Sequence, residues 1–413
     1  MNWKTLLVFS GILVCAATGC RKDPIIDPLP VASEDEDLAG ESVTVGETGF
    51  FTKLFVLNEG KMGTNNATLD FFRFSNGKYV RNAFDKMNPS QPLGLGDVGN
   101  DVKLCDGKIW AVMNNSGLVE VIDAFNERHI ATIPVRTPRN IAFDGSYAYV
   151  TSYAGAFVNY LADYSVGEHL ICKGRVYKIN RTTYSVIDSV DVGYQPEGIA
   201  CHDGRIYVAN SGGLSYAITY QYESTVSVID AGSFQEIGSV EVAPNLKDVF
   251  ADPDGNIYVT SFGDYFMNHS GIYSFKPGDT KAKRISTEGI GCNMTCATLS
   301  QRPGNPVAAG SEVFVIGTDD EWNWDPAAEK HYYLYSVSGG NKVTRYPAFR
   351  FDGDIPYGIC AAAEGNGTLK YLFVGDAVDY INPGAVSCYA AQEKFTRLWS
   401  TTSGVDPGHF CLY

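Results

Sequence analysis

A strand–turn–strand phrase recurs along this chain, and it constrains the fold more than any other feature. Its clearest copy begins at Pro196, turns at Asp203–Gly204 and continues through Ile206 to Asn210. Related copies begin at Gly99, Pro138, Pro244, Asn293, Pro356 and Pro407. Alternating side chains suit half-buried strands, and an Asp-Gly pair suits a two-residue hairpin. The phrase therefore predicts a repeated β-hairpin.

Two further strand-like runs follow the clearest copy, at Ser224–Asp230 and Ile237–Val242. Four strands per repeat are typical of a propeller blade. The composition agrees, because strand and turn formers are abundant (43 Gly, 25 Tyr and 22 Phe) while only 19% of residues are charged. We predict an all-β fold.

The two ends of the chain complete one repeat between them. Pro407–Tyr413 is one more first strand, and the chain then ends. Lys53–Asn58 and Thr68–Phe72 are second and third strands with no first strand before them. Joining the ends would remove the open edges of a ring of sheets. We therefore predict a single seven-bladed β-propeller over residues 51–413, closed by pairing the C-terminal strand with the N-terminal strands.

The N-terminus is typical of an exported lipoprotein. Lys4 precedes a short apolar run from Leu6 to Ala17, and Ala17-Thr18-Gly19-Cys20 resembles a bacterial lipobox. We predict a signal peptide over 1–19, lipidation at Cys20 and a disordered acidic tether over 20–50. An ordinary secretory signal with a coincidental cysteine is the alternative. No other stretch is apolar enough to span a bilayer, so membrane contact is expected only through the lipid.

The net charge of −15 argues against nucleic acid as a partner, since an acidic chain repels phosphate backbones. Eight cysteines remain outside the signal peptide and lipobox: Cys105, Cys172, Cys201, Cys292, Cys296, Cys360, Cys388 and Cys411. The sequence does not decide which of them pair. For most of them, which lie in strand-like runs, we expect buried free thiols.

Blade topology predicts where a ligand would bind. The turn before each first strand and the loop between second and third strands emerge on one face, and these loops are long and rich in aromatic residues and amides. Loops on a rigid scaffold often carry function. The candidate ligand-binding residues on this face are Asn58, Glu59, Asn114, Arg139, Tyr153, Tyr194, Gln195, Asn210, Tyr216, Lys247, Phe262, Tyr265, Trp322, Trp324, Tyr357, Asp376, Tyr380 and His409.

The sequence contains no catalytic motif in the structural context that its chemistry requires. Gly94–Gly99 matches a dinucleotide-binding pattern by letter, but a strand follows it where a helix is required. The six histidines show no metal-binding spacing, and no His–carboxylate set converges. We expect no enzyme activity, no metal and no catalytic cofactor. A glycan- or protein-binding surface propeller remains an alternative, and a lactonase- or lyase-type propeller enzyme is a further one.

Several phrases resemble known propeller families. Tyr149–Ser152 and Tyr207–Asn210 resemble the YVTN-type propeller repeat. Longer phrases resemble the surface cobalamin-binding propeller lipoproteins that gut anaerobes use to capture corrinoids: Val56–Gly63, Leu95–Asp101, Gly193–Glu197, Val208–Gly213, Asn382–Gly384 and Pro407–Phe410. This resemblance implies cobalamin or a related corrinoid as ligand. It also implies a TonB-dependent outer-membrane transporter as partner, and a lipid-anchored location on the cell surface at the outer membrane.

Overall fold

The computed structural model describes residues 36–37, 51–155, 172–213, 222–264, 267–286, 291–301, 309–318, 331–339, 341–364 and 367–413. The predicted signal peptide and Cys20 lie outside these residues, as does the predicted tether apart from β1 (Glu36–Asp37). Within the described part of the chain, no helix is both long and apolar enough to cross a bilayer.

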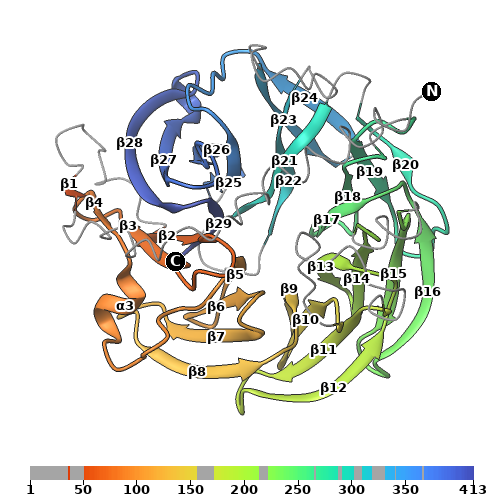
Figure 1. Cartoon of the computed structure of the whole chain (residues 1–413). Helices are drawn as coiled ribbons and strands as arrows, with labels where there is room; N and C mark the ends of the chain where they lie inside the picture. Colours follow the sequence, from red (N-terminus) through yellow and green to blue (C-terminus); the bar gives the residue numbers. More distant parts are fainter. Residues whose placement is uncertain are drawn as a thin grey trace, which may run out of the picture.

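The described chain is built from β-strands that pair antiparallel with their neighbours in sequence, and the resulting sheets surround a central axis (Figure 1). Four of the described sheets contain four consecutive strands each. They are β5 (Gly99–Cys105), β6 (Lys108–Met113), β7 (Leu118–Asp123) and β8 (His129–Pro134); β9 (Pro138–Asp144), β10 (Tyr147–Ser152), β11 (Arg175–Asn180) and β12 (Ser185–Asp191); β13 (Pro196–His202), β14 (Arg205–Asn210), β15 (Thr225–Asp230) and β16 (Gln235–Glu241); and β17 (Leu246–Ala251), β18 (Ile257–Ser261), β19 (Gly271–Phe275) and β20 (Lys283–Arg284). The prediction of an all-β propeller is confirmed.

The remaining described strands form a five-stranded and an eight-stranded sheet. The first has the order β1–β4–β3–β2–β29 and contains β2 (Lys53–Asn58), β3 (Thr68–Arg73), β4 (Lys78–Val80) and β29 (Pro407–Leu412). The second contains β21 (Gly291–Gln301), β22 (Ala309–Thr318), β23 (Tyr332–Ser338), β24 (Lys342–Tyr346), β25 (Pro356–Ala363), β26 (Leu369–Asp376), β27 (Pro383–Ala390) and β28 (Thr396–Val405). A short helix, α3 (Ala83–Met87), follows β4, and a 3-10 turn, η3 (Ala391–Glu393), follows β27.

The sheets therefore do not separate into the seven that the repeat predicts. Five described sheets have the size of a single blade, and the sixth is twice that size. The cause is local. β21 and β25 run parallel and share one residue pair, Gln301 opposite Ala362, which merges two sets of four strands into one sheet.

β2, near the start of the described chain, and β29, at its end, lie side by side (Figure 1). β29 pairs antiparallel with β2, with Leu54 opposite Leu412 and Val56 opposite Phe410. Glycines allow β29 to cross close over the neighbouring strands, because a Cβ at Gly358 would lie 2.2 Å from the carbonyl oxygen of Gly408. The last strand is thus held by backbone pairing on one side and by close packing on the other.

The second strands of the blades are apolar on both faces, and the stacking of neighbouring sheets explains why. In β14, Ile206 and Val208 pack into one buried cluster, while Tyr207 and Ala209 pack into another. Successive side chains of a strand point to opposite faces, so both faces must be covered. Burying one such side chain stabilises the fold by about 1.5–3 kcal/mol.

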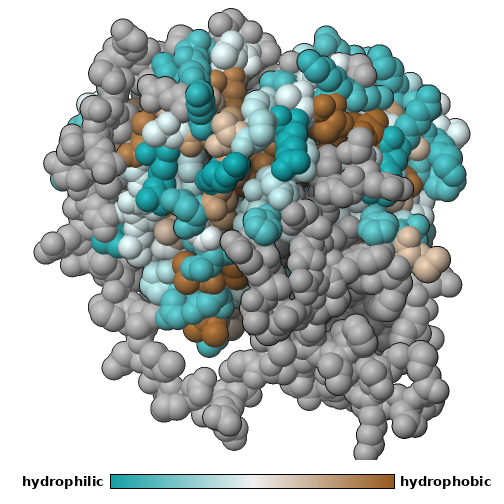
Figure 2. Space-filling model, turned by 90° about the horizontal axis from the view of Figure 1, so that it is seen from above, coloured by the Kyte–Doolittle hydropathy of each residue, from teal (hydrophilic) through white to brown (hydrophobic). Residues whose placement is uncertain are grey.

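The outer strands have a different character. Most of β12 and β16 is exposed to solvent. From above, hydrophilic side chains cover most of the coloured surface, and the hydrophobic ones form small, separate groups (Figure 2). The apolar surface is thus concentrated between the sheets.

The turns repeat as regularly as the strands. At the predicted hairpins Asp106–Gly107 and Asp203–Gly204, both residues have positive φ, as a type I′ turn requires. On the opposite face, the residue just before an inner strand also has positive φ at Val98, Thr137, Gln195, Asn245 and Asp406. This conformation costs non-glycine residues of order 1 kcal/mol. Its recurrence shows that the same chain reversal delivers each of these inner strands to the axis.

Candidate functional site

A cavity of about 710 Å³ lies on the axis, lined by residues of the inner strands β5, β9, β13, β17, β21, β25 and β29. The volume is in the range of small-molecule sites, about 300–1,000 Å³. The inner strands position the site because they supply most of the residues that line the cavity. The loops that follow the second strands add Glu59, Tyr153 and Phe262.

The structure brings some of the predicted ligand-binding residues together and places others elsewhere. Those that line the cavity are Glu59, Arg139, Tyr153, Lys247, Phe262, Tyr357, Tyr380 and His409. Those that do not are Asn58, Asn114, Tyr194, Gln195, Asn210 and Asp376. Tyr216, Tyr265, Trp322 and Trp324 lie outside the described residues.

The predicted asparagines away from the cavity hold strand ends. Asn58 donates from Nδ2 to Oγ1 of Thr68 at 3.0 Å, and Asn114 donates to the carbonyl of Pro138 at 2.8 Å. Asn210 donates to the hydroxyl of Ser227 at 3.0 Å. A buried amide needs such partners, which is why these side chains turn into the protein.

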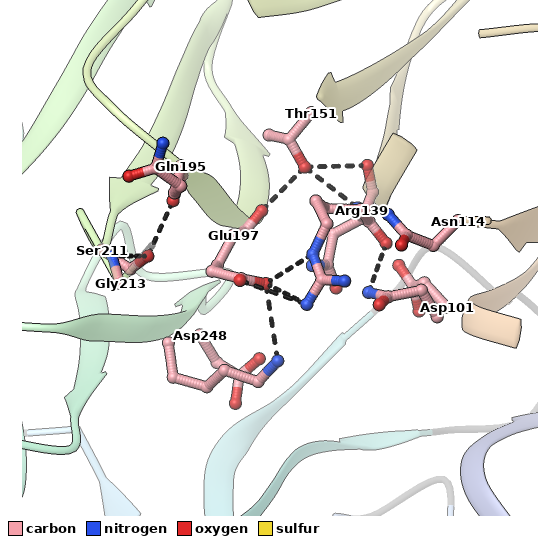
Figure 3. Close-up of polar contacts among 12 residues, drawn as sticks. Asp101, Asn114, Arg139, Thr151, Gln195, Glu197, Ser211, Gly213 and Asp248 are labelled. Atoms are coloured by element: carbon pink, nitrogen blue, oxygen red, sulfur yellow. Dashed lines mark hydrogen bonds and ion pairs between the residues drawn. The ribbon is translucent and has the colours of Figure 1, made fainter. Parts of the chain in front are cut away.

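The other predicted residues away from the cavity belong to turns. The carboxylate of Asp376 accepts backbone N–H bonds from Asp354, Ile355 and Val378 at 2.8–3.0 Å. Gln195 is buried and accepts from the hydroxyl of Ser211 through its backbone carbonyl at 2.8 Å (Figure 3). Tyr194 accepts from the backbone N–H of Gly212 at 3.0 Å.

A buried ion pair joins β9 to β13 at the cavity wall (Figure 3). Arg139 donates from Nη2 to both carboxylate oxygens of Glu197 at 3.0–3.1 Å and from Nε at 3.1 Å. Tyr153 lies against the guanidinium, 4.9 Å from ring centroid to Cζ, and donates its hydroxyl to the same carboxylate. Several donors converge on one carboxylate, which fixes all three side chains.

The carboxyl groups of this wall differ in their titration. Burial acts to raise the pKa of Glu197, but Arg139, Lys247 and Tyr153 outweigh it, so the pKa lies below its ordinary value and the group is ionised. At Asp248, burial is the main cause of a raised pKa, and the charge of Glu197 adds to it against the opposing effect of Lys247. The pKa values of these two carboxyls are therefore shifted in opposite directions.

A second pair links β5 to β9. Lys103 donates to Oδ2 of Asp101 at 2.9 Å and to the carbonyl of Ile141 at 2.7 Å. The same carboxylate oxygen accepts the backbone N–H of Ile141 at 2.9 Å. These bonds hold neighbouring inner strands together where no ladder joins them.

A third polar group lies where the chain ends meet. Nε2 of His409 lies 3.1 Å from Oε1 of Glu59. The rings of Tyr357 and Tyr380 pack edge to face with centroids 5.6 Å apart. Burial, followed by the charge of Glu59, raises the pKa of Tyr357 well above its usual range, so the phenol stays protonated. Aromatic faces and a hydrogen-bonding group are thus presented together.

Asp406 precedes β29 and carries a buried carboxyl whose Oδ1 has no hydrogen-bond partner among the described residues. Burial, with smaller contributions from Glu59 and Asp379, raises its pKa to about 7. The folded protein therefore binds this proton more tightly than the unfolded chain does. The corresponding stability is present at pH 4 and is lost as the pH rises through 7, by up to about 4 kcal/mol.

We expect Asp406→Asn to remove this loss, because an amide does not titrate in this range. The free energy of unfolding of the variant should therefore exceed that of the wild type by more at pH 8 than at pH 5. Asn tolerates the left-handed backbone at this position, φ 55°. Urea unfolding at the two pH values measures the difference. Asp188→Asn, on the exposed strand β12, is the control, and equal pH dependence of wild type and Asp406→Asn would contradict the prediction.

Several residues that line the cavity were not among the predicted ligand-binding residues. Asp101, Lys103, Glu197 and Asp248 line the cavity but belong to inner strands. A signal was present in the sequence, because charged residues near the start of an otherwise apolar first strand are unusual. Such residues need partners, and neighbouring blades supply them.

The described residues contain no group of three or more His, Cys, Asp or Glu side chains that could hold a metal ion. Six of the described cysteines are free thiols: Cys105, Cys172, Cys201, Cys360, Cys388 and Cys411. Of these, Cys105, Cys360, Cys388 and Cys411 are buried, as expected. Burial raises the pKa of Cys201, which lines the cavity. A raised pKa keeps this half-buried thiol protonated and lowers its reactivity.

Comparison with known proteins identifies the fold. No protein-family model matches the sequence, and no curated protein matches it. Among solved structures, hydrazine synthase of Kuenenia stuttgartiensis is similar with a TM-score of 0.54 and 16% identity, over 75% of this chain and 88% of that one. A candidate 6-phosphogluconolactonase of Bacteroides fragilis is similar with a TM-score of 0.53 and 11% identity, over 89% and 99%. The latter is a β-propeller, and at these identities the likeness establishes that fold for this chain and nothing further.

Proposed function

We propose that this chain is a lipid-anchored binding protein of the outer membrane, exposed at the cell surface, that captures cobalamin or a related corrinoid. We further propose that it delivers the corrinoid to a TonB-dependent transporter, and that it does so without catalysis. The observation that carries the proposal is the axial cavity and its rim, which consists of Glu59, Tyr153, Phe262, Tyr357 and Tyr380. The resemblance of the repeat phrases to corrinoid-capturing propellers supplies the ligand class.

The rim suits the chemistry of a corrinoid. A corrin is a large, partly apolar ring fringed by amide arms. Tyr153, Phe262, Tyr357 and Tyr380 offer flat apolar surfaces at the rim. Glu59 and the neighbouring ionic groups offer acceptors and donors for amides. A rigid rim of this kind lowers the entropic cost of ordering side chains on binding.

We also propose that the ring has seven blades and is closed by β29. The eight-stranded sheet would then count as two blades, β21–β24 and β25–β28. Support comes from its connectivity, since the two halves meet at one residue pair while strands within each half pair along their length. A crystal structure viewed along the axis would decide between seven blades and fewer.

Isothermal titration of the purified full chain in detergent with cyanocobalamin tests the proposed function. We expect tight binding, weakened about ten-fold or more in Tyr153→Ala/Phe262→Ala, because aromatic side chains often dominate binding energy. Trp322→Ala/Trp324→Ala tests two predicted ligand-binding residues that lie outside the described part of the chain. Phe125→Ala removes a largely exposed aromatic from a turn that does not line the cavity and is the control.

The outcomes separate the hypotheses. If all aromatic variants bind cyanocobalamin as tightly as the wild type, corrinoid binding is supported, but its site lies outside this cavity. No binding at high protein concentration would refute corrinoid capture. In that case aromatic rings at the rim would favour a glycan ligand, since such rings also stack on sugars, and a glycan array would be the next measurement.

A further inference from the structure

The lysine and arginine side chains that line the cavity, among the described residues, fall into two kinds. Two of them bond directly to a carboxylate: Lys103 to Asp101 at 2.9 Å, and Arg139 to Glu197 at 3.0 Å. Lys247 differs. Its Nζ lies 3.5 Å from Oε2 of Glu197, which is outside the usual N–H···O range of about 2.7–3.2 Å. The ammonium of Lys247 makes no hydrogen bond to any described residue.

Glu197 does not depend on Lys247 for compensation. Arg139 already meets both of its oxygens, and Tyr153 donates a further bond. Glu197 therefore has its hydrogen bonds without the ammonium, and Lys247 meets this carboxylate only as a more distant ion pair. The side chain of Lys247 is 26% exposed, and the ammonium is therefore partly removed from water.

Asp248 follows Lys247 in β17 and also lines the cavity. Burial favours the protonated, uncharged form of this carboxyl and raises its pKa. No hydrogen bond joins it to Lys247 among the described contacts. The three donors of the ammonium are thus available to a group that enters the cavity.

An ammonium that makes no hydrogen bond to the described residues attracts negative charge in a partly dry cavity, because charges interact more strongly there than in water. Lysine is a common binder of phosphate as a compact point charge. The whole protein carries −15 and repels anions at a distance, so a local cation is needed to hold one. We propose that Lys247 is an anion subsite of the cavity and that its ammonium binds one oxyanion of the ligand, a phosphate ester in particular.

This subsite rests on the proposed function for its natural ligand. Cobalamin carries a phosphodiester in its nucleotide loop, and cobinamide is the corrinoid that lacks it. The subsite therefore predicts discrimination between complete and incomplete corrinoids by charge. The rim aromatics, in contrast, would contact the ring that both molecules share.

Isothermal titration of cobalamin and cobinamide into the purified full chain tests the subsite. We expect the wild type to prefer cobalamin, and Lys247→Met to lose about 10- to 100-fold in cobalamin affinity with little change for cobinamide. Lys247→Arg restores the charge and should recover most of the preference. Lys281→Met is the matched control, since it removes one positive charge from an exposed pair with Glu241 away from the cavity.

The result that would overturn the subsite is equal affinity of the wild type for both corrinoids, or a cobalamin preference that survives in Lys247→Met. Either result leaves corrinoid capture standing. Thermal unfolding of each variant without ligand shows whether it is folded. If Lys247→Met does not fold, Lys247→Gln takes its place in the same comparison.

Failure of the function is distinguishable from failure of the subsite. If neither corrinoid binds, the proposed function falls, and inorganic phosphate then tests the subsite alone. A rise in Tm with phosphate concentration in the wild type and Lys281→Met, but a smaller one in Lys247→Met, would support it. An equal rise in all three proteins would overturn it, because phosphate also stabilises proteins without binding a site.

Discussion

Removal of residues 407–413 is expected to lower Tm by about 10 °C or more, or to leave an aggregated chain. β29 pairs along β2, and Phe410, Cys411 and Leu412 are all less than a tenth exposed. Losing these buried side chains and the backbone ladder removes several kcal/mol, a large share of the roughly 5–15 kcal/mol by which domains are stable. It also exposes β2 as an unpaired edge that can recruit another chain.

Differential scanning calorimetry and size-exclusion chromatography measure the effect. A synthetic peptide of residues 407–413 added in trans is the sharpest control, since an added strand can restore the ladder. Partial recovery of Tm with the peptide would locate the loss in strand pairing. A truncated protein that stays monomeric with Tm within about 2 °C of the wild type would show that β29 does not stabilise the fold.

Arg139→Met is expected to cost about 3–5 kcal/mol of stability, the second-largest effect predicted here. The change leaves the carboxylate of Glu197 buried, with the hydroxyl of Tyr153 and the more distant Lys247 as its remaining compensation. The side chains of Arg139 and Glu197 are only 16% and 9% exposed, so water can screen little of the loss. Denaturant unfolding of the wild type and the variant gives the difference.

A double variant separates the cost of an unpaired charge from the value of the pair. Arg139→Met/Glu197→Met should be more stable than Arg139→Met alone, because it leaves no uncompensated carboxylate. The matched surface pair Arg175–Asp191, whose side chains are 46% and 58% exposed, should respond to Arg175→Met by less than about 1 kcal/mol. Equal effects at the two pairs would contradict the assignment of Arg139 to a buried site.

These ion pairs also bear on function, because they hold the cavity wall in one shape. Arg139 and Glu197 come from adjacent blades, and Thr151 donates to the carbonyl of Glu197 at 2.7 Å (Figure 3). Asp101 and Lys103 connect the preceding pair of inner strands in the same way. Such cross-links keep the rim preorganised, which favours tight binding of a large rigid ligand.

Much of the fold could be predicted from the repeated strand–turn–strand phrase. The Asp-Gly hairpins at Asp106 and Asp203 were predictable because their local sequence favours one turn geometry. The partnership of β29 with β2 was predictable because the phrase at each end is incomplete without the other. The joining of β21 to β25 was not predictable, since it depends on where two strands approach in space.

The candidate site was predictable in part, and the difference follows from side-chain direction. Topology indicates which loops share a face, so Tyr153, Phe262 and Tyr380 were found. Topology does not indicate whether an amide turns outward to a ligand or inward to a strand end, and Asn58 and Asn210 turn inward. Glu197 and Asp248 were missed because charged groups that act on them come from other inner strands that are distant in the sequence.

The sequence by itself determined the all-β character, the hairpin turns and the pairing of the chain ends, because each follows from local preference and from periodicity along the chain. Only the tertiary structure decided which charges meet across blades. It placed Arg139 in hydrogen-bond contact with Glu197, and it placed the ammonium of Lys247 3.5 Å from the same carboxylate. The physical reason is that strand pairing is set by neighbours in sequence, whereas electrostatic compensation on the axis depends on strands about fifty residues apart that meet only when the sheets are arranged around it.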